Sequence, residues 1–378
     1  MKRVLITGSE GFVGRNLRVS LQGRKDLCVF SFDVLSDPQE LEGLLAQADF
    51  IFHLAGVNRP QNNDEFRTGN TTLTEQICRQ LSKSGRQVPL VLTSSTQAAL
   101  DNPYGASKRG AEDAVFAYGR DVGTPVYVFR LPNVFGKWCR PNYNSAVATF
   151  CHNIAHDLPI QVNDPSVELN LAYIDDVVHA FVALLGGVCT VKEDGFCQVQ
   201  PIHTVRLGEI VDTIRGFRQS RENRSIPNMA ESFVKKLYST YLSYLPTDGF
   251  SYPLTMHVDE RGSFTEFIKT EDRGQVSVNI LKPGITKGNH WHHTKNEKFL
   301  VVSGEGIIRF RKIGCQEILE YRVSDQKLEV VDIPTGYTHN ISNVGGGELV
   351  TVMWCNEKLD PEAPDTYFES VEHGHEED

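Results

Sequence analysis

Short apolar runs alternate with amphipathic helical segments through the first half of the chain. The apolar runs, which predict strands, occupy residues 2–7, 27–32, 50–54, 89–93 and 125–130. Between them apolar positions recur at helical spacing over residues 73–82 and 108–119, and another helix is expected near 13–22. Strands that alternate with helices predict an α/β domain built on a doubly wound parallel sheet.

The pattern changes after about Pro246. Helical periodicity fades, and apolar runs of strand length follow one another at short spacing. They occupy residues 263–269, 275–281, 298–302, 306–311, 327–333 and 348–354. This texture predicts an all-β sandwich or barrel. The segment LPTDGFSYP is the expected linker, so we expect domains at 1–245 and 246–378, with a mainly helical, substrate-facing lobe over 142–246.

Composition excludes several classes of function. The 378 residues include 38 Lys and Arg against 48 Asp and Glu, a formal charge of −10, so we expect no nucleic-acid partner. A hydrophobic content of 40% predicts a globular chain with a large core. Because neither an apolar stretch of roughly 20 residues nor a signal-peptide pattern occurs, we expect no membrane partner. The eight scattered cysteines indicate reduced thiols in a cytoplasmic protein, and the residues after Glu369 are expected to fray.

The first predicted strand runs into a glycine-rich turn that opens a helix. Gly8, Gly11 and Gly14 are spaced as GxxGxxG. In a dinucleotide site of the Rossmann type, these glycines permit a tight turn, close approach of a pyrophosphate, and close helix–strand packing. Asp33, after the second strand, would accept hydrogen bonds from an adenosine ribose and repel a 2′-phosphate, whereas Arg15 favours a phosphate. The choice between NADPH and NADH stays open at this point.

Tyr104 and Lys108 form a YxxxK pattern, and positions i and i+4 of a helix share one face. A neighbouring ammonium lowers the pKa of a phenol, which makes the tyrosine a proton donor near neutral pH. The preceding strand ends in Thr93-Ser94-Ser95, so a hydroxyl from Ser95 or Ser94 would hydrogen-bond the same substrate oxygen.

These motifs, over the first roughly 245 residues, resemble an extended short-chain dehydrogenase/reductase that acts on nucleotide sugars. The resemblance implies that serine, tyrosine and lysine form a catalytic triad. It places Ala55 and Gly56, after the third strand, against the cofactor, and Asn133 beside the sugar nucleotide. Further matches are His53, Asn70, 130–136 and 173–177. The loop after Ser95 is shorter than in many relatives, which leaves the choice between Ser94 and Ser95 open.

The second half carries two histidine-containing blocks, GX5HXHX4EX6G and PxGX2HX3N. Alternate residues of a strand share a face, so His290 and His292 can point into one barrel. Glu297 arrives from the next strand and His339 from a later one, while His293 is expected to face outward. Three imidazoles and a carboxylate suit Zn²⁺, and also Fe, Mn or Ni. The blocks therefore predict a metal site, with a polar, metal-free barrel interior as the alternative.

Both blocks resemble the motifs of the cupin family, which implies a cupin barrel, although Leu328 stands where the second motif often begins with glycine. The block DERGSFTE at 259–266 resembles the DxRGxFxE of cupin-type epimerases that act on 4-keto-6-deoxy sugar nucleotides. That resemblance implies substrate contacts for Arg261 and Glu266, with a salt-bridged strand end as the alternative. In those epimerases a histidine near the HxH position is a free base, which a metal-bound His290 could not be.

Both halves point to one type of substrate. A ketone on a sugar acidifies the proton on the neighbouring carbon, and a metal polarises that ketone as a Lewis acid. Removal and return of the proton gives an epimer, and hydride transfer then removes the ketone. Epimerisation must come first, because reduction abolishes the acidity. Tyr337, Lys295 and His293 neighbour the motifs, but the sequence does not identify the base.

Essentially the whole chain resembles a family of capsular polysaccharide synthesis enzymes that join a sugar-nucleotide reductase to a metal-binding cupin. The segments 57–60, 135–138, 238–244 and 288–293 carry this resemblance. It implies that the cupin epimerises C3 of a UDP-2-acetamido-2,6-dideoxy-4-hexulose and that the reductase reduces the C4 ketone with NADPH. The product would be UDP-N-acetyl-6-deoxy-L-talosamine, on the route to N-acetyl-L-fucosamine. The family also implies Zn²⁺ and a homo-oligomer, a dimer or larger.

Two other functions fit the same sequence. One is a single-function NAD(P)H-dependent 4-keto sugar reductase with a structural cupin module, in which metal removal would leave the stereochemistry of the product unchanged. The other is a sugar-nucleotide-binding regulator with inactive sites, which the intact Tyr104, Lys108 and predicted metal ligands disfavour.

Overall fold

The structure, a computed structural model, describes residues 1–358, 362 and 364–372. Residues 373–378 of the expected frayed end lie outside the described residues. Among the helices of the described part of the chain, none is long and apolar enough to cross a membrane.

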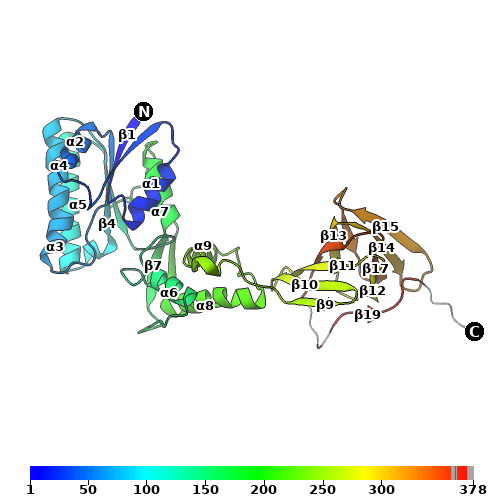
Figure 1. The fold of residues 1–378 in the computed structure, drawn as a ribbon. Helices are drawn as coiled ribbons and strands as arrows, with labels where there is room; N and C mark the ends of the chain where they lie inside the picture. The colour runs from blue at the N-terminus through cyan, green and yellow to red at the C-terminus, as the bar shows by residue number, and fades with distance from the viewer. Residues whose placement is uncertain (359–361, 363, 373–378) are drawn as a thin grey trace, which may run out of the picture. The chain divides into compact units, whose positions relative to one another are not determined.

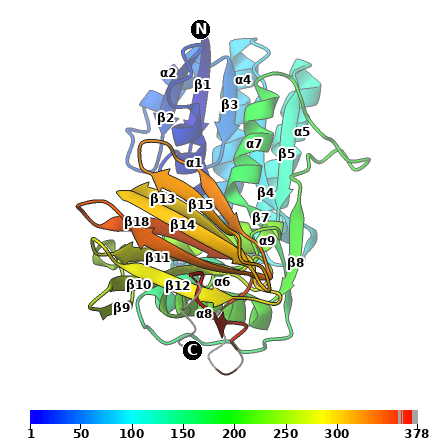
Figure 2. The same ribbon diagram turned by 90° about the vertical axis from the view of Figure 1, so that its right-hand side faces the viewer.

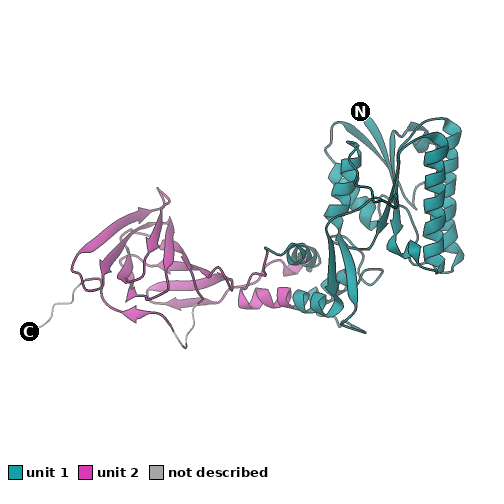
Figure 3. Ribbon diagram, turned by 180° about the vertical axis from the view of Figure 1, so that it is seen from behind, with its two compact units in different colours: residues 1–215, 230–246 teal, residues 216–229, 247–378 magenta. Residues whose placement is uncertain are grey.

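The chain divides into two compact units, residues 1–215 with 230–246 and residues 216–229 with 247–378 (Figure 3). Sequence analysis placed a single break near residue 245, whereas the segment 216–229 also groups with the second unit. A short pairing explains this grouping: the N–H of Lys269 donates to the carbonyl of Arg224 (2.9 Å), and the N–H of Ile226 donates to the carbonyl of Lys269 (3.0 Å).

A five-stranded parallel sheet forms the centre of the first unit (Figure 1). The strands lie in the order β2-β1-β3-β4-β5, and all pairs are parallel. They are β1 (Lys2–Thr7), β2 (Leu27–Phe32), β3 (Phe50–His53), β4 (Leu90–Ser95) and β5 (Val126–Leu131). The strand order reverses beside β1, and sheets of this kind bind ligands at the carboxyl edge next to the reversal. The predicted doubly wound sheet is confirmed.

Helices cover both faces of this sheet (Figure 1). One face carries α1 and α7, and the other carries α2, α4 and α5. These helices are α1 (Phe12–Leu21), α2 (Glu40–Gln47), α4 (Leu73–Ser84), α5 (Pro103–Val122) and α7 (Ile174–Leu184). Because successive strand residues point to opposite faces, Val4 and Ile6 enter the core under α1 and α7, and Leu5 enters the other core. The two cores therefore fix the sheet between its two layers of helices.

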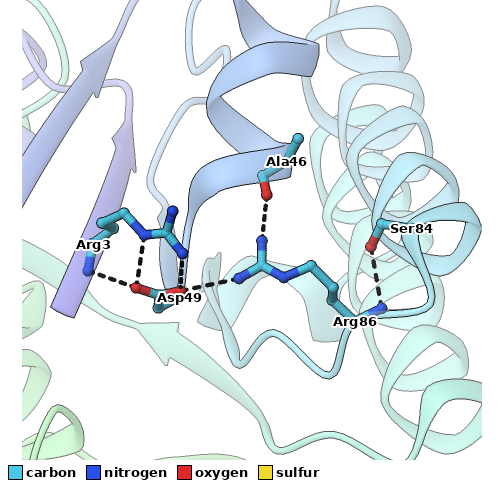
Figure 4. Close-up of polar contacts among 5 residues, drawn as sticks. All are labelled: Arg3, Ala46, Asp49, Ser84 and Arg86. Carbon is cyan, nitrogen blue, oxygen red and sulfur yellow. Dashed lines mark hydrogen bonds and ion pairs between the residues drawn. The ribbon is translucent and has the colours of Figure 1, made fainter.

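A cluster around Asp49 ties the amino edge of the sheet together (Figure 4). Its carboxylate accepts hydrogen bonds from the backbone N–H of Arg3 (2.9 Å) and from the Arg3 guanidinium (3.0 and 2.8 Å). Arg86 donates to the same carboxylate (3.0 Å) and to the carbonyl of Ala46 at the end of α2. The Arg3 guanidinium holds the pKa of Asp49 well below its usual range.

Shorter elements complete the first unit. A sheet of order β6-β7-β8 combines one parallel and one antiparallel pair. These elements are β6 (Asn133–Phe135), β7 (Glu168–Tyr173), β8 (Ile202–Arg206), α3 (Asp64–Phe66), the π-helical turn η1 (Arg67–Thr72), the 3-10 turn η2 (Thr96–Ala99), α6 (Ala146–Ala155) and α9 (Ser232–Leu242). Helix α8 (Leu207–Asn223) contains the boundary between the two units.

The second unit is built from two antiparallel sheets, seen in Figure 2. The sheet orders are β16-β13-β18-β11-β10-β9 and β15-β14-β17-β12-β19. The elements are the 3-10 turn η3 (Thr247–Gly249), β9 (Met256–Asp259), β10 (Gly262–Lys269), β11 (Gln275–Leu281), β12 (Thr286–Trp291), β13 (Glu297–Ser303), β14 (Glu305–Lys312), β15 (Ile318–Ser324), β16 (Val330–Ile333), β17 (Tyr337–Asn343), β18 (Leu349–Cys355) and β19 (Tyr367–Phe368). Phe299 and Phe310 belong to an apolar core between the sheets. The predicted all-β second half is confirmed.

Candidate functional site

The glycine-rich turn between β1 and α1 has space only for glycines. Gly8 has a φ of +70°, and a Cβ there would lie 2.6 Å from the backbone nitrogen of Ala55. A Cβ on Gly14 would lie 2.0 Å from the carbonyl oxygen of Gly8. Gly11 precedes the first residue of α1 and offers no side-chain cap, so the N–H groups of that helix end are available to an anion. The turn fits the pyrophosphate of a dinucleotide.

Asp33 lies beside this turn. Its carboxylate accepts hydrogen bonds from the backbone N–H of Glu10 (2.6 Å) and of Val34 (2.8 Å), which fixes the loop after β2 against the turn. Arg15 is exposed, and its guanidinium lies 4.8 Å from the centre of the Trp138 ring. Asp33, which would repel a 2′-phosphate, is therefore held by backbone N–H groups, whereas Arg15, which would favour one, lies against Trp138.

Helix α5 presents Tyr104 and Lys108 at the carboxyl edge of the sheet. The Asn102 side chain accepts a hydrogen bond from the N–H of Gly105 (2.8 Å), which starts the helix just before Tyr104. The ammonium of Lys108 lies 5.9 Å from the centre of the Tyr104 ring and donates to the carbonyl of Thr93 (3.2 Å). Burial lowers the pKa of Lys108 to about 8, although the carboxylate of Glu112 opposes this shift.

The Tyr104 phenol has two side-chain partners. Its hydroxyl donates to the Oδ1 of Asn58 (2.9 Å), and Ser95 hydrogen-bonds it from the end of β4. Burial raises the pKa of Tyr104, and the hydrogen bond with Ser95 opposes this shift. Asn58 was not singled out by sequence analysis. Its only signal was its place in the segment 57–60, which carries the whole-chain resemblance.

The two serines of β4 face different environments. The Ser94 hydroxyl donates to the carboxylate of Glu112 (2.5 Å) and is buried. Glu112 also pairs with Arg130 through two hydrogen bonds of 2.9 and 2.6 Å. Ser94 is therefore engaged in the core, and Ser95 is the serine at Tyr104. Asn133, two residues past β5, is exposed at the start of β6.

A chain of buried hydrogen bonds links the ends of β1 and β3 to the helical segment that contains Asn70 and Thr74. His53 is completely buried, and its ring nitrogens contact the hydroxyls of Thr7 (2.7 Å) and Thr74 (2.9 Å). Burial, followed by the nearby Lys108 charge, lowers the pKa of His53 to about 3, so its ring is neutral. The Thr74 hydroxyl donates to the carbonyl of Asn70 (2.6 Å) in the π-helical turn.

Asn70 links three elements. Its amide bridges the backbone of Val57 (2.9 and 3.1 Å) and donates to the Ser107 hydroxyl of α5 (3.0 Å). A Cβ on Gly56 would lie 2.9 Å from the Asn70 amide oxygen and 3.0 Å from the Lys108 ammonium. The segment that contains Ala55 and Gly56 therefore passes directly beside the Tyr104–Lys108 pair.

The second unit brings together His290, His292, Glu297 and His339. The ligand atoms of these four residues all lie within 4.8 Å of one another. His290 lies on β12, Glu297 begins β13, and His339 lies on β17. Sequence analysis placed both histidines of the HxH pair on one strand, but β12 ends between them at Trp291.

Several atoms of this cluster are buried without a partner. The Nε2 atoms of His292 and His339 lie 3.7 and 3.3 Å from Oε2 of Glu297, and none of these three atoms makes a hydrogen bond among the described residues. Burial, followed by the neighbouring His339, lowers the pKa of His290 to about 4, so its ring is neutral. Three imidazoles and a carboxylate whose buried ligand atoms include several without a partner among the described residues fit a divalent metal.

The four residues line a cavity of about 490 Å³. Arg261 lines it and pairs with Asp259 (2.6 Å), and Lys287 and Lys295 add two further amines. Glu266 lies elsewhere: it is buried between Arg224 (2.9 Å) and Lys269 (2.7 Å) and does not line the cavity.

The three residues considered for the epimerisation base are also separated. Lys295 lines the cavity and is buried. His293 is exposed and lies against the rings of Trp291 (4.5 Å) and Tyr367 (4.9 Å). Tyr337 lines a different cavity, of about 580 Å³.

Comparison with known proteins defines the class. Residues 4–193 match the NAD dependent epimerase/dehydratase family, and residues 257–367 match the polysaccharide biosynthesis C-terminal domain. The chain therefore belongs to the NAD dependent epimerase/dehydratase family, among its sugar-nucleotide oxidoreductases.

Two relatives match over nearly the full length. The UDP-2-acetamido-2,6-beta-L-arabino-hexul-4-ose reductase of Pseudomonas aeruginosa is 48% identical over 98% of this chain and 100% of its own. The crystal structure of the capsular polysaccharide assembling protein CapF from Staphylococcus aureus is 55% identical, with a TM-score of 0.93 over 97% of this chain and 100% of that chain. These matches confirm the resemblance to capsular polysaccharide synthesis enzymes. The UDP-glucuronic acid 4-epimerase of Bacillus cereus, with UDP-glucuronic acid and NAD, is 16% identical with a TM-score of 0.53 over 64% of this chain and 98% of that chain, and shares the fold.

Proposed function

We propose that the chain catalyses two consecutive steps on one nucleotide sugar. The second unit epimerises C3 of a UDP-2-acetamido-2,6-dideoxy-4-hexulose, and the first unit reduces the C4 ketone with NADPH. The product is UDP-N-acetyl-6-deoxy-L-talosamine. The substrate class is supported by the 48% identical reductase of P. aeruginosa. The observation that carries the proposal is the presence in one chain of a Tyr104–Lys108 pair and a separate His–Glu cluster.

In the reduction, the nicotinamide supplies the hydride when it is bound. The glycine turn and the start of α1 hold the pyrophosphate. Ser95 and Tyr104 hold the ketone oxygen, and Tyr104 donates its proton to that oxygen as the alcohol forms. Once Tyr104 has given up its proton, the Lys108 ammonium stabilises the phenolate that remains.

In the epimerisation, His290, His292, Glu297 and His339 would hold a zinc ion, which would supply Lewis acidity at the ketone. Arg261 and Lys287 bring positive charge to the cavity and suit a diphosphate or an enolate. Lys295 is the first candidate for the base, since it lines this cavity and the other two residues considered do not. To act as the base, Lys295 must have an unprotonated amine at the moment it accepts the C3 proton.

The test is to run the reaction with the UDP-4-keto-6-deoxy sugar and NADPH in D₂O and to analyse the product by mass spectrometry and NMR. Deuterium at C3 together with a reduced C4 supports both steps. Reduction without deuterium at C3 leaves the alternative, a single-function reductase with a structural second unit. An incubation with the His290→Ala variant corrects for deuterium that enters C3 without the metal site.

A further inference from the structure

The segment 364–371, which we call the strap, crosses the strands that carry the metal ligands. Its strand β19 pairs with β12, where Phe368 lies opposite His290 and Tyr367 opposite Trp291. The N–H of Glu369 then donates to the carbonyl of Asn289 (3.0 Å), just before His290. The strap therefore continues the sheet on the side of the first ligand.

The far end of the strap is anchored in the same sheet. Val371 is completely buried. The guanidinium of Arg311 on β14 donates to the carbonyls of Val371 (3.0 Å) and Ser370 (2.6 Å) and to the Glu369 carboxylate (2.8 Å). The hydroxyl of Thr338 donates to the Glu369 carbonyl, next to the ligand His339 on β17. Two of the ligand-bearing strands thus contact the strap directly.

Asp365 makes the contacts that bear on metal binding. Its backbone carbonyl accepts a hydrogen bond from Nδ1 of His292. Its carboxylate accepts hydrogen bonds from the N–H groups of His293 (2.9 Å), Thr294 (2.6 Å) and Lys295 (2.8 Å). The carboxylate therefore fixes the turn between β12 and β13, which connects His292 to Glu297.

We propose that Asp365 is a positioning residue of the metal site, so that the affinity for the metal depends on the strap. When Nδ1 of His292 donates to the Asp365 carbonyl, the proton sits on Nδ1 and the lone pair of Nε2 is free. That Nε2 is buried, has no partner among the described residues, and lies 3.7 Å from the Glu297 carboxylate. Partners of this kind orient a ligating imidazole and raise its basicity, and their loss typically costs about 10–100-fold in metal affinity.

The strap also forms part of the cavity wall, because Thr366 lines the same cavity as the four ligands. One segment therefore supports the metal ligands and borders the space next to them. This inference rests on the metal site of the proposed function, and its test must separate the two.

The experiment compares the full chain with its Asp365→Ala and Asp365→Asn variants. Zinc affinity is measured by competition with a chromogenic chelator, and the Tm is measured for the metal-free and the zinc-loaded protein. Asp365→Ala should weaken zinc binding about 10–100-fold, because three N–H groups lose their acceptor and the carbonyl shifts. Asp365→Asn keeps one acceptor oxygen, so its zinc affinity should lie between those of the wild type and of Asp365→Ala. The zinc-induced rise in Tm should shrink in the same order.

The matched control is Asp325→Ala, which removes a carboxylate that accepts a hydrogen bond from the N–H of Gly304 (2.9 Å) and does not line the cavity. It should leave zinc affinity unchanged. Equal zinc affinity in the wild type and in both Asp365 variants, with the Tm lowered by a similar amount with and without zinc, would mean a purely structural role and would overturn the inference. If the wild type itself binds no zinc, the metal site of the proposed function fails first and the inference fails with it.

Discussion

In the first unit the buried polar side chains around Tyr104 have protein partners, whereas in the second unit several buried atoms of the His–Glu cluster have none among the described residues. His53, Ser94 and Lys108 are each hydrogen-bonded inside the protein. Around Glu297, buried nitrogen and oxygen atoms have no partner among the described residues. An unpaired buried polar group costs about 1–3 kcal/mol. The buried groups of the first site are thus satisfied within the protein, whereas these atoms of the second site would gain partners when a ligand binds.

The largest expected effect is a loss of reduction at the first site that leaves the second site unchanged. Tyr104→Phe removes the proton donor but keeps the ring that packs on Phe66 (5.4 Å), so reduction should fall about 10²–10⁴-fold. NADPH consumption measures this loss. Deuterium entry at C3 in D₂O should persist in the same variant. A rate within tenfold of the wild type would show that Tyr104 is not the donor.

Metal removal should affect the second unit and spare the first. A ligand that binds only the folded state stabilises it by about 4 kcal/mol at about 1,000 times its Kd. Treatment with a chelator should therefore lower the Tm of one unfolding transition in calorimetry, and zinc should restore it. Tyr104→Phe serves as the control and should show the full shift, while His292→Ala should show none. Identical scans with and without zinc would contradict the contrast between the sites.

The Lys108 amine makes the first site sensitive to pH. Its pKa is lowered to about 8 by burial, so the cation is lost as pH rises through 8, and kcat/KM for reduction should fall about tenfold per pH unit above that value. Between pH 8 and 10.5 the unfolded chain binds more protons at this residue than the folded chain, so this group makes the fold more stable as pH rises. Lys108→Arg stays charged, so whatever activity it retains should not fall in this range. A wild-type profile that stays flat to pH 10 would contradict this role.

The smallest expected effect concerns Asn58. Asn58→Ala removes the acceptor of the Tyr104 hydroxyl, a neutral hydrogen bond worth about 0.5–1.5 kcal/mol, so kcat/KM should fall up to about tenfold. The matched control is Asn62→Ala, since the Asn62 side chain makes its hydrogen bonds within the exposed loop around Glu65. Steady-state kinetics would give kcat/KM for both variants. Equal values for Asn58→Ala and Asn62→Ala would show that Asn58 does not contribute to the site.

Local patterns predicted much of both sites. The glycine turn could be predicted because its residues are neighbours in sequence and no Cβ fits at Gly8 or Gly14. The sheet could be read because apolar strands alternated with helices. The four residues of the His–Glu cluster also meet as their spacing suggested.

The sequence could not show contacts that depend on tertiary packing. Asn58 meets Tyr104 across 46 residues, and Asp365 meets His292 across 73. The choice between Ser94 and Ser95 depends on which of the two serines faces Glu112 on helix α5. Glu266 has the residue type expected of a substrate contact, but β10 has an irregular register between Glu266 and Ile268, and the side chain lies between Arg224 and Lys269.

The strap has a consequence for the order of events during synthesis. A ribosome makes a protein from its N-terminus, and units that emerge first can fold first. The four proposed metal ligands emerge before the strap, because His339 precedes residue 364. A nascent second unit can therefore form its sheets while His292 still lacks the carbonyl that orients it. If the strap positions His292 as proposed, firm metal capture would wait until residues 364–371 have left the exit tunnel.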